Sequence, residues 1–377
     1  MPLSLPTWPP DWSSIRQSVQ VSLENGDWGR YQSETSQQLT IDLISMLQPA
    51  RQRNQPAVDL APPAAVQLCC SGTAAIELAL RLAKVGPGDE VVLCGYDYPG
   101  NLRTIELLGG RPVLVDAAPG RTSPGAQQVE QAICDQTAAV IVSHLYGQVA
   151  DVVAIDQLCR QYGVVLIEDA CQVPGMTLGG RVAGSIGSLG TLSFGGSKPL
   201  TAGNGGALII RDERLAARLP ALVDRPSDAF PLSPLQAAAL RPQFKRLSEL
   251  NRLRADTADH LAKQSTLSTW TPIHSNVATV EPCHYKFAWQ ARDADHRDRI
   301  LRVAADAGLP IGLGFRHAAN TSDRRCRKLG TLPNARALGE TVLLLDHRAL
   351  LTTPDQWPEL VQALTDVHDQ TRPSPSN

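Results

Sequence analysis

Two kinds of segment alternate along residues 64–168. Short apolar runs, typical of strands covered on both faces, are separated by segments whose apolar residues recur every three or four positions, as in amphipathic helices. The expected strands are residues 64–70, 90–94, 112–116, 138–144 and 164–168, and the expected helices are 73–84, 100–108, 127–134 and 151–162. Strands that alternate with helices in units of about 25–30 residues predict a parallel sheet with helices on both faces.

The pattern changes on either side of this region. Helices are expected at residues 13–23 and 34–47, before a polar, proline-rich loop at 48–63. After Asp169 we expect glycine-rich loops at 174–190, strands at 190–194 and 206–210, a helix at 212–222 and a long, mostly helical bridge at 232–264. A strand at 286–291 and helices at 295–307 and 358–367 follow.

These elements predict an α/β protein with two domains. Residues 1–245 are expected to form an N-terminal arm and a large, doubly wound domain with a mostly parallel sheet. Residues 246–377 are expected to form a smaller C-terminal α+β domain.

Composition narrows the classes of partner. The 377 residues carry 35 basic and 37 acidic side chains, a net charge of −2, so a nucleic-acid partner is not expected. No apolar run reaches the roughly 18 residues of a membrane span, and the first twelve residues lack the pattern of a signal peptide. The eight cysteines include no C-x-x-C pair, which favours reduced thiols over disulfides or a zinc site. We therefore expect a cytoplasmic protein.

Three predicted strand ends carry candidate chemistry, because ligands of doubly wound sheets bind outside the carboxyl ends of the strands. The first is the sequence SGT at residues 71–73, where a strand leads directly into a helix. The free N–H groups and positive dipole of a helix start suit a phosphate, and Gly72 lets it come close to the backbone. The alternative is that Ser71 or Thr73 is an ordinary helix cap.

The other two strand ends offer a carboxylate and an amine. Asp169 follows the apolar run VVLIE, where it either faces the ligand crevice or forms a helix cap or structural ion pair. Lys198 lies among glycines in TLSFGGSKPLTAGNGG, residues 191–206, which alone could be a surface turn. Together the three ends match pyridoxal 5'-phosphate, whose phosphate needs a helix start, whose ring nitrogen needs a carboxylate, and whose aldehyde needs a lysine. The eight histidines show no metal-ligand spacing, so no metal is expected.

Nine motifs carry a resemblance to a known family. They are SGTAAIELAL (71–80), GPGDEVV (86–92), LLGGRPVLVDA (107–117), HLYGQVADVVAI (144–155), IEDACQ (167–172), SFGGSK (193–198), GNGGALI (203–209), SPLQAA (233–238) and PNARALGE (333–340). With these motifs in this order, the chain resembles the DegT/StrS family of sugar aminotransferases, which are pyridoxal-phosphate enzymes of fold type I.

The resemblance implies a role for each matching residue. Lys198 would form the internal aldimine with the cofactor and move protons during catalysis, and Asp169 would pair with the ring nitrogen. The other implied cofactor contacts are Gln172 at the ring hydroxyl, Tyr98 on the ring face, and Gly72, Thr73 and Ser193 at the phosphate. A plain core aromatic at 98 and a helix cap at 172 are the alternatives. His317 matches, more loosely, a substrate-facing histidine.

The implied reaction moves an amino group from glutamate or glutamine to a keto-sugar, nucleotide-activated in many relatives, within a homodimer. The alternatives are a cyclitol (keto-inositol) substrate and a non-catalytic, cofactor-binding regulatory protein. Three positions depart from the family pattern: Ala229 stands where an Asn usually contacts the phosphate of the partner subunit, Asn204 replaces a Glu, and Cys171 replaces an Ala. Lys198 itself favours transamination, because related dehydratases carry His there.

Overall fold

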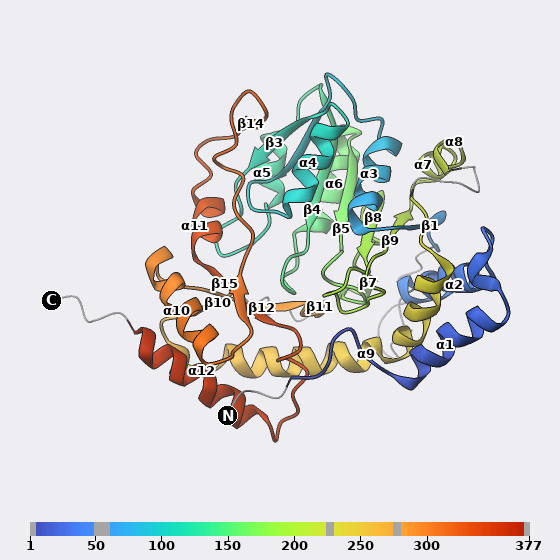
Figure 1. The fold of residues 1–377 in the computed structure, drawn as a ribbon. Coiled ribbons are helices and arrows are strands. Elements are labelled where there is room, and N and C mark those ends of the chain that lie inside the picture. The colour runs from blue at the N-terminus through green and yellow to red at the C-terminus, as the bar shows by residue number, and fades with distance from the viewer. Residues whose placement is uncertain (1–4, 49–60, 224–229, 274–279, 373–377) are drawn as a thin grey trace.

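The core of the protein is a sheet of eight strands in the order β1-β9-β8-β5-β4-β2-β3-β14 (Figure 1). The computed structural model describes residues 5–48, 61–223, 230–273 and 280–372. The strands are β1 (Ala65–Cys69), β2 (Glu90–Cys94), β3 (Arg111–Val115), β4 (Thr137–Ser143), β5 (Val165–Asp169), β8 (Leu189–Ser193), β9 (Gly206–Ile210) and β14 (Arg327–Lys328). All are parallel except β9, which is antiparallel to β1 and β8, so the prediction of a mostly parallel sheet is confirmed.

Both faces of this sheet are covered, which explains its continuous apolar strands. In β2, Val91 and Leu93 pack in the core that includes α3 (Gly72–Leu82) and α4 (Pro99–Leu107). Val92, between them, packs in a separate core with residues of α5 (Ala126–Glu130) and α6 (Val152–Tyr162). Since successive side chains of a strand point to opposite faces, β2 contributes to both cores.

The strand order reverses beside β2. After β2 the chain adds β3 on one side, and then β4, β5 and β8 on the other. Such a switch in direction separates the loops that follow neighbouring strands and opens a crevice at their carboxyl ends. The loops that follow β2 and β4 therefore flank the position where a ligand is expected.

Several element boundaries differ from the expected ones. The helix expected at 127–134 ends early as α5, and the segment 212–222 forms two short helices, α7 (Glu213–Ala216) and α8 (Pro220–Val223). Pro220 explains why the helix is interrupted between α7 and α8, because proline lacks the N–H that a continuing helix requires. The expected loop at 174–190 contains two short strands, β6 (Thr177–Leu178) and β7 (Arg181–Val182). Residues 49–60 of the loop expected at 48–63 lie outside the described residues.

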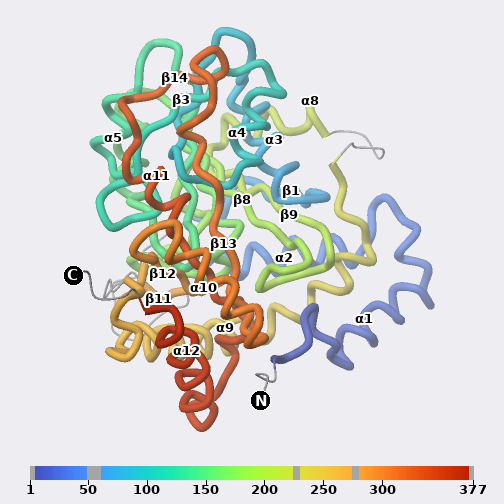
Figure 2. The backbone as a smooth tube through the Cα atoms, turned by 60° about the vertical axis from the view of Figure 1, so that its left-hand side comes forward, coloured from blue at the N-terminus to red at the C-terminus, as the bar shows by residue number. Residues whose placement is uncertain are grey.

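The predicted helical bridge is α9 (Pro234–Ala262), which begins with a capping box between Ser233 and Gln236. Its first half packs against the N-terminal helices α1 (Ser13–Glu24) and α2 (Glu34–Leu47), whose expected positions are confirmed. Figures 1 and 2 show α9 running from these helices to the C-terminal elements. The predicted domain boundary at 245/246 falls within this continuous helix, and the division stays a prediction.

The C-terminal elements form a four-stranded antiparallel sheet in the order β10-β12-β15-β13. Its strands are β10 (Thr271–Ile273), β12 (Lys286–Gln290), β13 (Ile311–Leu313) and β15 (Val342–Asp346), and α10 (Ala294–Asp306) and α12 (Trp357–Thr371) pack in the same core. The sequence prediction missed β15 and the preceding α11 (Pro333–Thr341). A small sheet pairs β11 (Val280–Glu281) with β6, so segments distant in the sequence are joined by backbone hydrogen bonds.

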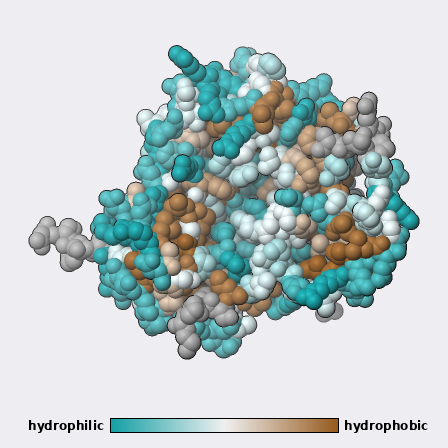
Figure 3. All heavy atoms as spheres, viewed as in Figure 1, coloured by the Kyte–Doolittle hydropathy of each residue, from teal (hydrophilic) through white to brown (hydrophobic). Residues whose placement is uncertain are grey.

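Among the described residues, no helix is long and apolar enough to cross a membrane. Apolar side chains are instead exposed on the N-terminal helices, where Val21, Leu23 and Ile41 are each about half exposed. Figure 3 shows apolar surface in this part of the molecule, over α1 and α2. Exposed apolar patches of this kind often mark an interaction surface.

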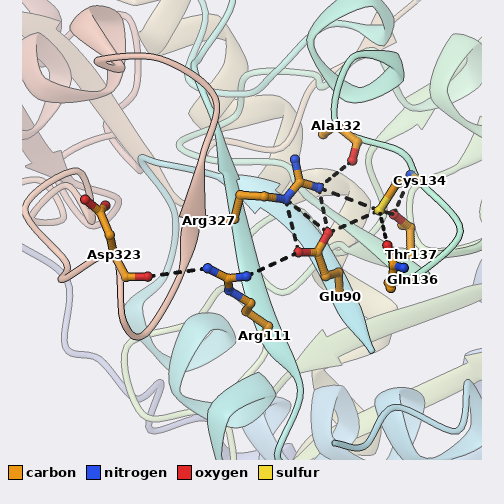
Figure 4. A network of polar contacts seen from close by, with 8 residues as sticks. All are labelled: Glu90, Arg111, Ala132, Cys134, Gln136, Thr137, Asp323 and Arg327. Atoms are coloured by element: carbon orange, nitrogen blue, oxygen red, sulfur yellow. Dashed lines mark hydrogen bonds and ion pairs between the residues drawn. The ribbon is translucent and has the colours of Figure 1, made fainter. Parts of the chain in front are cut away.

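An ion pair between a half-buried arginine and a buried glutamate joins the C-terminal segment to the large sheet (Figure 4). Arg327 of β14 donates to Glu90 of β2 from Nε at 3.0 Å and from Nη2 at 2.6 Å, and Nη2 also donates to the Ala132 carbonyl at 2.8 Å. The hydrogen bonds from Arg327 lower the pKa of the Glu90 carboxyl, although its burial opposes this. The Glu90 side chain is only 9% exposed, so its charge depends on its cationic partners, of which Arg327 is the nearer and Arg111, with Nη1 4.0 Å from Oε1, the more distant.

We therefore expect Arg327→Gln to lower the free energy of unfolding by about 1–3 kcal/mol at pH 7, measured by urea denaturation. A carboxyl whose pKa is lowered by folding contributes stability above its ordinary pKa and loses it as the pH falls through the lowered value. The difference between wild type and variant should therefore narrow below about pH 4. Arg325→Gln is the control, since Arg325 pairs with Glu106 at the exposed surface; an equal loss in both variants would contradict the assignment.

Candidate active site

A cavity of about 240 Å³ lies at the carboxyl ends of β5 and β8 and the amino end of α3. Seven residues that the sequence marked as candidates line it: Gly72, Thr73, Tyr98, Asp169, Gln172, Ser193 and Lys198. The fold thus brings together side chains from well-separated parts of the chain. A larger groove of about 1360 Å³ lies between α1, α2 and α9, but none of these candidates lines it.

The start of α3 forms one end of the cavity. Ser71 is the helix cap, because its Oγ accepts from the Ala74 N–H at 3.0 Å. Gly72 and Thr73 follow in the first turn, where backbone N–H groups have no partners within the helix and can bind an anion. Gly72 is required by close packing: a Cβ there would lie 2.8 Å from Ser193 Cβ and 2.9 Å from Cys171 Sγ.

Asp169 ends β5 at the floor of the cavity and is 5% exposed. Its Oδ1 accepts from the Cys171 N–H at 3.0 Å. Its Oδ2 accepts from Asn101 Nδ2 at 3.1 Å and from Ser143 Oγ at 3.3 Å. Among the described residues Asp169 forms no ion pair, so its negative charge is held by neutral donors and stays available to a cationic ligand.

Gln172 and Tyr98 occupy the walls. Gln172 is buried, and its Oε1 accepts from the Tyr146 N–H at 3.0 Å, which leaves Nε2 as the donor for a ligand. Tyr98 is 41% exposed, and its ring packs 5.8 Å from that of Phe315. It is therefore not a plain core aromatic. A Cβ on Gly100 would lie 2.2 Å from Tyr98 Cε1, so the glycine makes room for this ring position.

Lys198 lies in the loop between β8 and β9 and is half-buried. Its backbone is fixed at both ends: the N–H donates to the Gly195 carbonyl at 2.9 Å, and the carbonyl accepts from Trp8 Nε1 at 3.0 Å. Its Nζ lies 4.2 Å from the ring centre of Tyr285, a cation–π contact. Lys198 is thus a fixed side chain at the cavity rather than a solvated lysine on a surface turn.

His144 lines the cavity and was not selected from the sequence. Its Nδ1 accepts from the Ala150 N–H at 3.1 Å, so Nε2 carries the proton that is donated to Glu168 Oε1 at 3.0 Å. Although burial alone would raise the pKa of Glu168, the hydrogen bond from His144 and those from backbone N–H groups lower it. Asn101 was also missed; the sequence signal was its place in the first turn of α4, three residues after Tyr98.

The remaining candidates lie elsewhere. His317 is not among the residues that line the cavity; its Nε2 is 3.9 Å from Glu340 Oε1, and burial, followed by the charge of Arg336, lowers its pKa. Asn204 contributes its carbonyl, which accepts from Gln236 Nε2 at 3.0 Å and links the Lys198 loop to α9. Ala229 lies outside the described residues.

A doubly wound sheet with a lysine, an aspartate and a helix start at one cavity defines the fold type I class of aminotransferases. Residues 64–364 match the model of the DegT/DnrJ/EryC1/StrS aminotransferase family. The chain belongs to this family, as the sequence motifs predicted.

Relatives of known name align with the chain over most of their length. The chain is 28% identical to an L-glutamine:2-deoxy-scyllo-inosose aminotransferase of Streptomyces lividus, over 96% of this chain and 94% of that protein. It is 30% identical to the UDP-2-acetamido-2-deoxy-3-oxo-D-glucuronate aminotransferase of Pseudomonas aeruginosa, over 76% and 81%. With the L-glutamine:2-deoxy-scyllo-inosose aminotransferase of Streptomyces kanamyceticus the identity is 33%, and the match covers 62% of that protein.

Solved structures give the same fold. The aminotransferase TlmJ from Streptoalloteichus hindustanus superimposes with a TM-score of 0.85 at 25% identity, over 98% of this chain and all of that one. The PLP form of Spr1654 from Streptococcus pneumoniae superimposes with a TM-score of 0.83 at 20% identity, over 99% of this chain and all of that one.

The close packing at Gly72 generates a prediction about ligand affinity. Gly72→Ala is expected to raise the dissociation constant of pyridoxal phosphate at least about tenfold, because the new methyl group must displace Ser193 or Cys171 at the anion end. Absorbance titration of the apoprotein measures this. Gly86→Ala is the matched control, because a Cβ there has no contact closer than 4.0 Å. Unchanged affinity in Gly72→Ala would show that no phosphate binds at this helix start.

Proposed function

We propose that this chain is a pyridoxal-phosphate-dependent aminotransferase that moves an amino group from glutamine or glutamate to a cyclic, polyhydroxylated ketone. A nucleotide-activated keto-sugar and a keto-inositol are the two acceptor classes, since relatives with each kind of substrate align with most of the chain. The observation that carries the proposal is that one cavity holds Lys198, Asp169 and the start of α3.

The residues of the cavity fit pyridoxal 5'-phosphate. The start of α3 and Ser193 would hold the phosphate, Asp169 the ring nitrogen, Gln172 Nε2 the ring hydroxyl and Tyr98 the ring face. Two features support this fit: the glycine at 72 leaves no side chain over the anion end, and the Asp169 charge has no cationic partner among the described residues. When bound, the cofactor supplies an electron-withdrawing ring that stabilises charge on the carbon attached to the transferred nitrogen.

The chain's own groups then supply binding and proton transfer. Lys198 Nζ would attach the cofactor and, once released, act as the base and acid that moves a proton at the substrate carbon. Asp169, held by Asn101, Ser143 and the Cys171 N–H, would keep the ring nitrogen protonated. Lys198 Nζ lies 4.2 Å from the centre of the Tyr285 ring, and this cation–π contact holds it close to the cavity.

We further propose a cytoplasmic homodimer. The apolar side chains exposed on α1 and α2 offer a surface for a second copy, and the resemblance to a family whose members act as dimers supports this proposal.

Lys198→Ala is expected to abolish covalent attachment of the cofactor. Wild-type protein mixed with pyridoxal phosphate should develop a visible absorption band that borohydride removes, and mass spectrometry should then find the label on the peptide that contains Lys198. Lys263→Ala, at the exposed C-terminal end of α9, should behave as wild type. A band of equal strength in the Lys198 variant would refute the assignment.

The amino donor and acceptor are tested separately. Glutamine or glutamate is expected to convert the cofactor of the wild-type protein to its amino form in a single turnover. The change in the absorption spectrum measures this conversion. If no donor does so although the cofactor binds, the regulatory alternative holds. The aminated protein is then offered a keto-inositol and a nucleotide-linked keto-sugar, and product is detected by mass. Transfer to neither would exclude both acceptor classes.

A further inference from the structure

A second buried carboxyl group lies behind Asp169. Asp97, in the loop that follows β2, is 7% exposed and does not line the cavity. The amide of Asn101 lies between the two carboxyl groups, with Nδ2 3.5 Å from Asp97 Oδ1 and 3.1 Å from Asp169 Oδ2. The same Nδ2 is 3.3 Å from Ser143 Oγ, which also contacts Asp169. The four side chains form one polar cluster beneath the cavity.

Asp97 is incompletely satisfied in this cluster. Its Oδ1 accepts from the Tyr98 N–H at 2.7 Å, but its buried Oδ2 has no hydrogen-bond partner among the described residues. No lysine, arginine or histidine of the described part of the chain forms an ion pair with Asp97, and the neighbouring charge is that of Asp169. A buried carboxylate without a cation is costly, so the group lowers its free energy by keeping a proton.

The titratable groups around Asp97 support this conclusion. Burial first, and then the charge of Asp169, raise the pKa of Asp97 to about 7. The other titratable groups that sense its charge are Tyr146 and Cys94, whose pKa values burial also raises, so both are neutral near pH 7. Asp97 is therefore the group of this cluster that changes charge near neutral pH.

We propose that Asp97 is a positioning residue that keeps a proton beneath the cavity and, through Asn101 and Ser143, sets the charge that Asp169 presents to the cofactor's ring nitrogen. The role toward the ring nitrogen rests on the proposed function. With Asp97 protonated, one negative charge faces one protonated ring nitrogen. With Asp97 ionised, a second buried negative charge would raise the pKa of the ring nitrogen further.

The first test uses apoprotein and does not depend on the cofactor. Asp97→Asn keeps the shape of the side chain and removes the titration. Because folding raises the pKa of Asp97, its stabilising effect is greatest at low pH and is lost as the pH rises toward about 7. The folding equilibrium constant of the wild type should therefore fall relative to that of Asp97→Asn by up to about tenfold per pH unit between pH 5 and 7, and level off above that. If the folding equilibrium constants of the wild type and of Asp97→Asn depend on pH in the same way, the proposal is overturned.

The second test measures the visible absorption of the bound cofactor as a function of pH. In protein loaded with pyridoxal phosphate, Asp97→Asn should shift the midpoint of the pH-dependent visible absorption by at least about half a pH unit. Asp156→Asn is the matched control, because Asp156 is also buried but lies on α6 beside Arg160; it should leave the midpoint unchanged. If the cofactor binds and the midpoints agree, the role of Asp97 toward the ring is wrong. If no band forms at all, the proposed function fails, while the apoprotein test still decides the protonation of Asp97.

A spectroscopic measurement on wild-type apoprotein covers the case in which Asp97→Asn does not fold. The infrared difference spectrum between pH 6 and pH 8 should contain the C=O stretch of one protonated, buried carboxyl group. Ser143→Ala, which keeps Asp97 and removes one of its neighbours, should move the midpoint of this band. A spectrum without a protonated carboxyl at pH 6 would overturn the proposal.

Discussion

The active site depends on the way the buried carboxylate of Glu168 is bound at the end of β5. Glu168 and Asp169 are adjacent in the strand, so their side chains point to opposite faces of the sheet. Glu168, fully buried, accepts from the Gly184, Ile186 and Gly187 N–H groups at 2.8–3.0 Å and from His144. These bonds connect the loop before β8 and the residue after β4 to β5. They therefore fix the positions of the strand ends around the cavity relative to one another. Asp169 is left to face the ligand.

The surroundings of the two carboxylates differ in a way that supports the role proposed for Asp169. Glu168 accepts from three backbone N–H groups and from the His144 imidazole, and it is not among the residues that line the cavity. Asp169 is held by an amide, a hydroxyl and one N–H, which orient it without neutralising it. Neutral donors of this kind position a carboxylate for a cationic ligand, which can then bind without first displacing a cationic side chain.

Much of this site could be predicted from the sequence, because it follows the strand ends of a regular parallel sheet. Asp169, Gly72 and Lys198 were identifiable from an apolar run, a strand-to-helix junction and a glycine-framed lysine. The roles of His144 and Asn101 depend on distances across the sheet that no local pattern encodes. β14 was missed for a similar reason: two residues make no hydrophobic period, and its attachment depends on long-range contacts, namely backbone pairing with β3 and the Arg327–Glu90 contact across 237 positions. The apolar run of β15 carries no alternation that tells a buried strand from a buried helix segment, and α11 directly precedes it.

The burial of Asp97 beside Asp169 could not be predicted from the local sequence. In the sequence GYDYPGN, residues 95–101, an aspartate before a tyrosine and a proline is typical of a turn. Its Oδ1 accepts from a local backbone N–H, that of the next residue, Tyr98. Only the fold places that turn beneath Asp169, with Asn101 one helical turn away to bridge them. A residue suited to a loop by its hydrogen bonding is thereby buried beside a like charge. The cost is reduced when it holds a proton, and the protonation state of the cluster then becomes part of the site's electrostatics.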